Sequence, residues 1–147
     1  MFRHKKLKQG LYKPRHPQKY RGDPTKIRYM SSWELNFHTF LDNNSNVLEW
    51  ASEELAIPYI KPTDNRIHKY YPDYWVKYKD KSGNIKIDLI EVKPAEQTVP
   101  SVSKNNRIRL IENVTYAINI AKWKAAQEFA RNNGWGFRIV SKNEIFK

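Results

Sequence analysis

Asp73 and Glu91 are the two residues whose types and spacing most clearly suit chemistry. Between them, the segment Lys81-Ser82-Gly83 is typical of a three-residue hairpin loop with glycine at the left-handed position. Counting back along both strands from this loop places Asp73 directly opposite Glu91, with Cβ atoms about 5 Å apart. Two carboxylates this close repel each other unless a cation lies between them, and carboxylate oxygens favour Mg²⁺ or Mn²⁺. The pattern therefore predicts a divalent-metal site.

Lys93 belongs to the same pattern, because it lies two residues beyond Glu91 and so on the same face of the strand. The earlier positions of that face are apolar: Ile85, Ile87 and Leu89. A core face that turns ionic at its end indicates a functional site, since burying charge is costly. The alternative is a cross-strand ion-pair cluster of the same three charged residues, and without further context the two are about equally favoured. Asp88 points to the opposite face and is expected to be a plain surface charge.

Glu34 is a third candidate acid, and it has two possible roles. Ser31 and Glu34 form the pattern of a capping box, in which the glutamate stabilises the start of a helix. Glu34 also shares a helix face with Phe37 and Leu41, which directs it toward the sheet that carries the other two acids.

The elements that must position these residues are predicted in the order αβββαβ, which makes an α/β (α+β) fold with a mixed sheet flanked by helices. A helix is expected from residue 31 until the polar run at 42–46, and a second one over about 114–132, with an apolar stripe that starts at Val114. The expected strands are 55–60, 68–79, 84–93 and 136–140, followed by a tail at 143–147.

The chain has 147 residues, enough for one domain, and its net charge of +12 is unevenly distributed. Residues 1–30 carry ten basic residues and one acid, so we expect a basic DNA-contacting arm (1–30) ahead of a catalytic domain (31–147). A membrane surface is the competing partner, but the arm lacks an amphipathic apolar stripe. The tyrosines of the arm could stack on bases or could dock on the domain. The candidate DNA contacts in the arm are Lys13, Arg15, Lys19, Arg21 and Arg28.

Several function classes are excluded or disfavoured by composition. The chain has no cysteine, which removes disulfides, thiolate-bound zinc and a cysteine nucleophile. It has no apolar run of membrane-spanning length and no glycine-rich phosphate loop, so neither a membrane partner nor a nucleotide cofactor is expected.

The Pro72-Asp73 and Glu91-Val92-Lys93 motifs, with an acid on the preceding helix, resemble those of the PD-(D/E)XK nuclease superfamily and its restriction-endonuclease-like core. Longer segments resemble the head completion nucleases of contractile-tailed phages, and more distantly the Tn7-type transposon-end endonucleases. These segments are 17–23, 27–34, 46–50, 68–74, 91–94 and 121–123. Met30 departs from the pattern, since an arginine is expected there.

The resemblance implies roles for individual residues. Asp73 and Glu91 would bind Mg²⁺, for which Mn²⁺ could substitute, with help from the Val92 carbonyl. Lys93 would position or deprotonate the attacking water. Glu34 would contribute directly or through water, which makes a second metal possible.

Three further residues are weaker candidates for substrate contacts. His68 is favoured as a phosphate contact by the resemblance but not by its odd spacing from Asp73, which places it on the opposite face of an unbroken strand. Gln97 and Lys122 are lesser candidates, with solvated surface as the default.

The expected function is Mg²⁺-dependent hydrolysis of DNA phosphodiester bonds, by endonuclease or exonuclease action, during phage head completion and head–tail joining. Expected partners are DNA and phage head or neck proteins. The expected location is the host cytoplasm during virion assembly, with retention in the head–neck region of the virion as a further possibility. The alternatives are a non-catalytic DNA-binding plug at the head–tail joint and a site-directed endonuclease of the transposon or restriction type.

Overall fold

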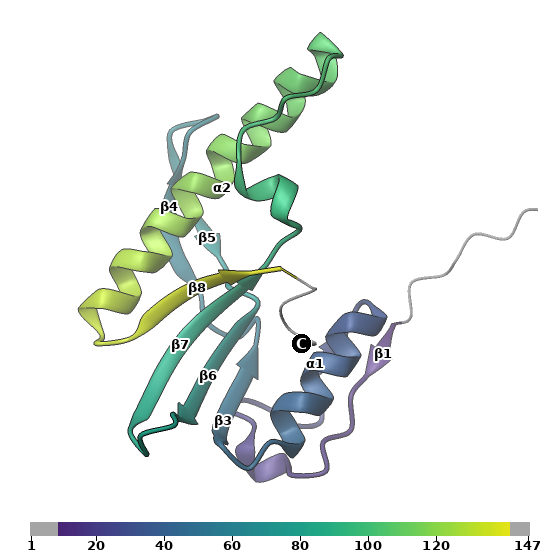
Figure 1. The fold of residues 1–147 in the computed structure, drawn as a ribbon, viewed down its shortest axis with the longest axis vertical. Helices are drawn as coiled ribbons and strands as arrows, with labels where there is room; N and C mark the ends of the chain where they lie inside the picture. Colours follow the sequence, from purple (N-terminus) through teal and green to yellow (C-terminus); the bar gives the residue numbers. More distant parts are fainter. Residues whose placement is uncertain (1–8, 142–147) are drawn as a thin grey trace, which may run out of the picture.

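The computed structural model describes residues 9–141, which build a four-stranded mixed sheet with one long helix on each face (Figure 1). The strand order is β3-β6-β7-β8, in which β8 alone runs parallel to its neighbour. The strands are β3 (Val47–Ser52), β6 (Tyr74–Lys79), β7 (Ile85–Val92) and β8 (Gly136–Val140), and the helices are α1 (Ser32–Asn43) and α2 (Asn106–Asn132). The core therefore has the expected αβββαβ order, and the predicted fold class is confirmed.

Helix α1 begins where the sequence predicts, because the Ser31 hydroxyl accepts a hydrogen bond from the Glu34 backbone N–H. Phe37 and Leu41 are buried, and Phe37 meets the ring of Tyr74 on β6 edge to face at 4.6 Å. At the other end, the ammonium group of Lys19 donates to three backbone carbonyls, those of residues 41, 42 and 44. This lysine therefore satisfies the carbonyls at the C-terminal end of α1.

Helix α2 differs from its prediction in length and in its buried face. It begins at Asn106, eight residues before the predicted start, and its N-terminal part extends beyond the sheet (Figure 1). Val114 is exposed rather than buried. The residues that bury against the sheet are Asn119, Trp123, Ala126 and Ala130. Ile118, Ala121, Ala125 and Phe129 of the predicted stripe do pack against the core, whereas Val114 does not, because the first turns of the helix extend beyond the sheet (Figure 1).

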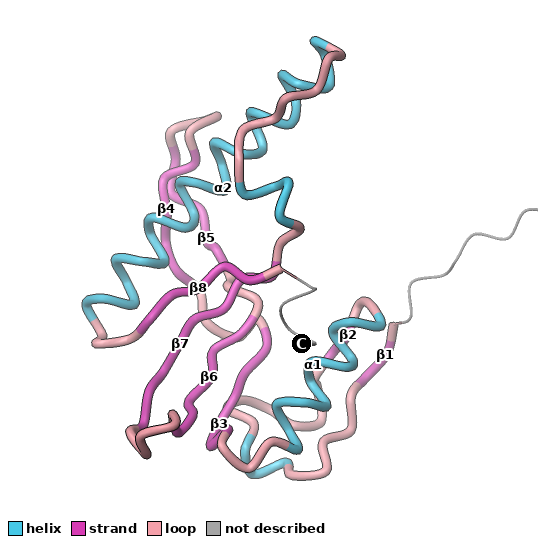
Figure 2. The backbone as a smooth tube through the Cα atoms, viewed as in Figure 1, coloured by secondary structure: helices cyan, strands magenta, loops and turns pink. Residues whose placement is uncertain are grey.

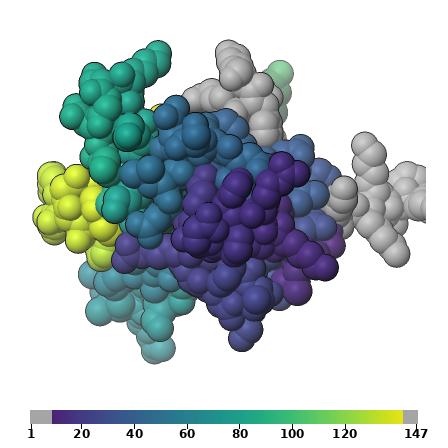
Figure 3. All heavy atoms as spheres, turned by 90° about the horizontal axis from the view of Figure 1, so that it is seen from below, coloured from purple at the N-terminus to yellow at the C-terminus, as the bar shows by residue number. Residues whose placement is uncertain are grey.

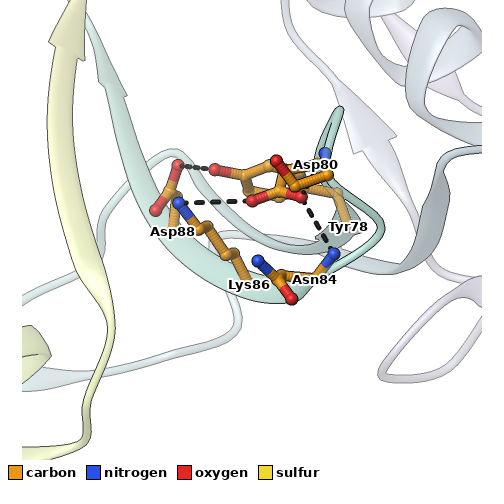
Figure 4. Close-up of polar contacts among 6 residues, drawn as sticks. Tyr78, Asp80, Asn84, Lys86 and Asp88 are labelled. Carbon is orange, nitrogen blue, oxygen red and sulfur yellow. Dashed lines mark hydrogen bonds and ion pairs between the residues drawn. The ribbon is translucent and has the colours of Figure 1, made fainter.

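The β6–β7 hairpin has the predicted register, with Tyr74 opposite Ile90 and Lys79 opposite Ile85. In its loop, a carboxylate oxygen of Asp80 accepts the backbone N–H groups of Ser82 and Asn84. Gly83 takes the left-handed conformation (φ 84°) that the turn requires. Figure 4 shows how these contacts close the hairpin.

The prediction that Asp88 is a plain surface charge is wrong, because only 6% of this residue is exposed. It accepts a 2.8 Å hydrogen bond from the Tyr78 hydroxyl, drawn in Figure 4, and forms an ion pair with Arg138 at 3.2 Å. The parallel strand β8 covers this position, and a side chain at Gly136 would collide with the Asp88 carboxylate. Burial is tolerated because the carboxylate is both hydrogen-bonded and paired.

The predicted strands 55–60 and 68–79 need correction. The chain at 68–79 forms two strands in different sheets, interrupted at residues 71–73, so β5 (Arg66–Tyr70) pairs only with β4 (Ile57–Lys61). These two strands form a separate ribbon, inserted between β3 and β6 and visible beside α2 (Figure 2). The first strand of the core sheet is β3, in a segment to which the sequence analysis assigned no strand.

Residues 9–30 dock on the domain, one of the two alternatives for the arm tyrosines. β1 (Gly10–Leu11) pairs with β2 (Arg28–Tyr29), and a short helical turn, η1, spans Pro17–Lys19. Tyr20 and Ile27 are buried in the core, and the Tyr20 ring packs against Trp50 at 4.8 Å. Figure 3 shows these purple residues lying against the blue residues that follow them in the chain. The basic residues before position 9 and the tail predicted at 143–147 lie outside the described residues. Within the described part of the chain, no helix is both long and apolar enough to cross a bilayer.

Candidate active site

The predicted acids and lysine come together where β6 begins and β7 ends. Glu91 and Val92 are the last two residues of β7, and Asp73 immediately precedes β6. The Val92 backbone N–H donates a 2.8 Å hydrogen bond to Oδ2 of Asp73. The Nζ atom of Lys93 lies 3.7 Å from Oε2 of Glu91. The hairpin register, which ends with Tyr74 opposite Ile90, therefore brings these residues close together.

The position of Asp73 also depends on a residue that sequence reasoning missed. The backbone N–H of Glu53 donates to the Asp73 carbonyl at 3.1 Å, across the start of β6. Glu53 adopts a left-handed conformation (φ 51°) just after β3, which is uncommon for a residue with a side chain. A glutamate in this conformation gives no signal in the sequence, because the left-handed region is usually marked by glycine or asparagine.

The carboxyl groups of Asp73 and Glu91 both have raised pKa values. Burial, and next the charge of Glu91, raise the pKa of Asp73 from 3.8 to about 7. Burial also raises the pKa of Glu91, against the opposing effects of Tyr70 and Lys93. The raised pKa values mean that the positive charge around the two carboxylates is too small to stabilise both in their charged form. A divalent cation between them would supply it.

Tyr70 is the second functional candidate that the sequence analysis missed. Its hydroxyl donates a 2.7 Å hydrogen bond to Oε1 of Glu91, and both side chains are buried. In one continuous strand, Tyr70 would stand three residues from Asp73 and face the other way. The break at residues 71–73 moves Tyr70 into the ribbon and turns its hydroxyl toward the carboxylates.

Glu34 lies close enough to this site to affect the pKa of Tyr74, but its side chain contacts the start of α1. Its carboxylate accepts a 3.2 Å hydrogen bond from the Ser31 hydroxyl. Its charge, with those of Asp73 and Glu53, helps to raise the pKa of Tyr74 after the larger effect of burial. Among the residues described, no three His, Asp or Glu side chains are close enough to hold one ion together. Glu34 was predicted to contribute to the metal site either directly or through water, and this arrangement favours a contribution through water.

Lys122 of α2 also lies near Glu91. Its ammonium group stands over the rings of Tyr59 and Tyr70, at 5.9 and 5.7 Å from their centres. Burial, and next the charge of Lys93, lower its pKa, while Glu91 raises it. Two lysines, Lys93 and Lys122, thus lie near Glu91 and come from different elements.

The remaining candidates for DNA contacts fall into two groups: exposed side chains, and side chains that contact other parts of the protein. The exposed ones are Lys13, Arg15, Arg28 and, in the short helix η2 (Ala95–Thr98), Gln97. Arg21 is exposed and stacks over Trp75 at 4.5 Å. The ammonium of Lys19 is occupied by carbonyls, and His68 bonds Asp64 at 2.8 Å rather than either acid of the pair.

The donor set suits a hard divalent cation. It combines the Asp73 and Glu91 carboxylates, which repel each other without one, with the neighbouring Val92 carbonyl. Oxygen-only donors of this kind fit Mg²⁺ or Mn²⁺ better than zinc. The residues present therefore fit the metal that the sequence predicts.

Comparison with known proteins agrees with this geometry. The sequence model of the TnsA-like endonuclease N-terminal family matches residues 44–142. The chain belongs to the TnsA-like endonucleases. The matched segment runs from just before β3 to just after β8, so it contains Asp73, Glu91 and Lys93, whereas Glu34 precedes it.

A second comparison covers nearly the whole chain. The head completion nuclease of Enterobacteria phage T4 is 37% identical over 142 residues, which is 92% of each protein. The similarity therefore extends beyond the endonuclease segment to α1 and to most of the N-terminal residues. The predicted resemblance to both groups is confirmed.

Proposed function

We propose that this protein is a metal-dependent deoxyribonuclease that hydrolyses DNA phosphodiester bonds during phage head completion. The observation that carries the proposal is the close pair of mutually repelling carboxylates, buried Glu91 and partly buried Asp73, beside Lys93 in a chain of an endonuclease family. The similarity to the T4 protein over both full lengths supports the biological setting. In that setting the protein acts in the host cytoplasm, meets head or neck proteins and can stay in the head–neck region of the virion.

Asp73 and Glu91 would hold Mg²⁺, together with the Val92 carbonyl. The bound ion would activate a water molecule and neutralise charge on the phosphate. Lys93, already within ion-pair distance of Glu91, would orient the attacking water and stabilise negative charge on the phosphate. Lys122 would contact the phosphate from α2, and Glu34 would act through water.

Exposed cations outside this centre would hold the DNA backbone. Lys13, Arg15 and Arg28 are exposed, Arg21 is exposed while stacked on Trp75, and the uncharged Gln97 is also exposed and could hydrogen-bond a phosphate. Lys19 has a structural role that competes with phosphate binding, and His68 is engaged by Asp64. The last two are therefore the weakest members of the predicted set.

The decisive experiment incubates the purified protein with plasmid and linear DNA, in the presence of Mg²⁺, Mn²⁺ or EDTA. We expect cleavage with either metal and none with EDTA. Asp73→Asn, Glu91→Gln and Lys93→Met should each lower the rate by at least about a hundredfold while remaining folded. Glu96→Gln, which removes an exposed acid from the nearby turn η2, is the matched control and should cleave normally.

The same variants test the non-catalytic plug. If the protein only closed the head–tail joint, particles assembled with Asp73→Asn would be as infectious as the wild type. Cleavage at a single plasmid sequence would instead favour a site-directed endonuclease.

A further inference from the structure

The β4–β5 ribbon is an insertion in the core order, since it lies between β3 and β6 in sequence and pairs only with itself. Its inner face is fixed, because Ile57, Tyr59 and Tyr70 are buried. That face packs against α2 (Figure 2). At its base, Tyr70 touches Glu91. The ribbon is thus a rigid extension that starts at the candidate active site.

The outer face of the ribbon carries an apolar pair. Ile60 and Ile67 are direct cross-strand partners, and they are 58% and 75% exposed. Single exposed apolar residues are ordinary on protein surfaces. Two isoleucines facing each other on a two-stranded ribbon form a small apolar ridge, however, and the described part of the chain leaves it uncovered.

Positive charge lies beside this ridge and at the end of the ribbon. Lys69 shares the outer face with the two isoleucines, whereas the cross-strand partners Lys61 and Arg66 follow the inner-face positions and lie at the far end of the strands, next to the turn. Asp64 is the one acid among residues 57–70, and it is engaged by His68. A partner that fits this surface is therefore strongly negative and also offers apolar faces. DNA combines the two, because phosphates border stacked bases.

We propose that the β4–β5 ribbon is a DNA-distorting element, in which Ile60 and Ile67 pack against the bases of an opened step close to the cleaved bond. Lys61, Arg66 and Lys69 contact the flanking phosphates. Apolar wedges of this kind unstack base steps in other DNA-binding proteins, at an energetic cost that the added contacts offset. The inference rests on the proposed function, since it requires DNA to lie at Asp73 and Glu91.

Distance supports the arrangement. Ile67 stands three residues before Tyr70, which is about 10 Å along an extended strand. The ridge therefore begins about 10 Å along the ribbon from the residue that contacts Glu91, although it lies on the opposite face of the strand from Tyr70. The ribbon would select DNA that is easily unstacked, such as DNA at ends, nicks or flexible steps.

The test uses the double variant Ile60→Thr/Ile67→Thr, because threonine keeps the β-branched shape while it removes apolar surface. Ile85→Thr is the matched control: this residue is also 58% exposed on a strand, but it lies at the opposite end of β7 from Glu91. Each protein is titrated, in EDTA to prevent hydrolysis, into duplexes that carry single 2-aminopurine substitutions and either a nick or intact strands.

We expect the wild type and Ile85→Thr to raise 2-aminopurine fluorescence near the bound step, more for nicked duplexes. The double variant should lose most of this signal and bind about tenfold more weakly. Its dependence on salt should be unchanged, because its charges are intact. Replacing Lys61, Arg66 and Lys69 by glutamine should instead reduce the salt slope.

Wild-type fluorescence and affinity in the folded double variant would overturn the proposal. So would the absence of any fluorescence change when the wild-type protein binds, since the bases would then stay stacked. A double variant that binds DNA normally but no longer self-associates would assign the ridge to a contact between copies. If the wild type neither bound DNA in this titration nor cleaved it with Mg²⁺, the proposed function itself would fail. That result differs from a loss of signal confined to the double variant.

Discussion

The Tyr70 hydroxyl donates a 2.7 Å hydrogen bond to Oε1 of Glu91 and so connects the β4–β5 ribbon to the candidate metal site. Lys93 is within ion-pair distance of the other carboxylate oxygen, so both oxygens of Glu91 have a fixed neighbour. Such contacts orient a metal ligand before the metal binds. Tyr70 is therefore a positioning residue.

Tyr70→Phe should raise the Mg²⁺ concentration needed for half-maximal cleavage by about tenfold, with a smaller effect at saturating Mg²⁺. Phenylalanine keeps the ring under Lys122, so the change isolates the hydroxyl. The Mg²⁺-induced rise in melting temperature provides a second measurement and should shrink in parallel. Tyr71→Phe, at an exposed neighbouring position, is the control. An unchanged Mg²⁺ requirement would remove Tyr70 from the site.

The raised pKa of Asp73 predicts how stability depends on pH without metal. Between about pH 4 and 7 the folded protein holds a proton on Asp73 that the unfolded chain has already released, so stability falls as pH rises through this window. Asp73→Asn should therefore be more stable than the wild type at pH 8, by up to about 4 kcal/mol, and about equally stable near pH 3.5. Denaturant unfolding in EDTA at both pH values measures the difference. A variant less stable at pH 8 would contradict the repulsion between the acids.

Mg²⁺ should reverse that order at pH 8. The wild-type protein gains stability by binding the ion, whereas Asp73→Asn has lost a ligand and gains little. Thermal melts with increasing Mg²⁺ measure this effect without any DNA.

Glu34→Gln should separate the two roles of this residue. As a cap, glutamine can replace glutamate with little change in stability. As an acid that acts on the metal site through water, Glu34 is needed for its charge, so we expect a folded variant with a sharply reduced rate or a raised Mg²⁺ requirement.

Ser31→Ala is the control for Glu34→Gln. It should cost about 1 kcal/mol of stability through loss of the cap, while cleavage persists. Wild-type rate and metal dependence in Glu34→Gln would assign Glu34 to the helix start alone.

Asp42 should be essential for docking of the N-terminal segment. Its buried carboxylate accepts the Tyr12 hydroxyl and the backbone N–H groups of Arg15 and His16, at 2.6 to 3.0 Å. Asp42→Ala leaves three donors without a partner and should cost at least about 3 kcal/mol in the free energy of unfolding. Glu49→Ala removes a surface ion pair with Lys77 and should cost less than about 1 kcal/mol. A stability loss at Asp42 no larger than at Glu49 would show that the segment docks independently of this carboxylate.

The sequence by itself determined the chemistry and the local geometry of the acids. A three-residue loop fixes the register of a hairpin, and register fixes which residues are opposite, so Asp73, Glu91 and Lys93 could be placed together by counting. The start of α1 was equally local, because Ser31 caps the helix through a residue three positions away. The αβββαβ order was also predicted, but its first strand was placed at 55–60, in the ribbon, instead of at β3.

Only the tertiary structure decided what surrounds the acids. The break at residues 71–73 separates β5 from β6. It contains Pro72, which cannot donate a ladder hydrogen bond, so the sequence marks the break, but only the tertiary structure shows that β5 leaves the core sheet and lies beside α2. This break turns Tyr70 toward Glu91. The contact of Glu53 with Asp73 and the burial of Asp88 beneath β8 also join residues at least ten positions apart, from separate strands or turns. Periodicity reports which face of an element is apolar, whereas these contacts depend on what lies against that face.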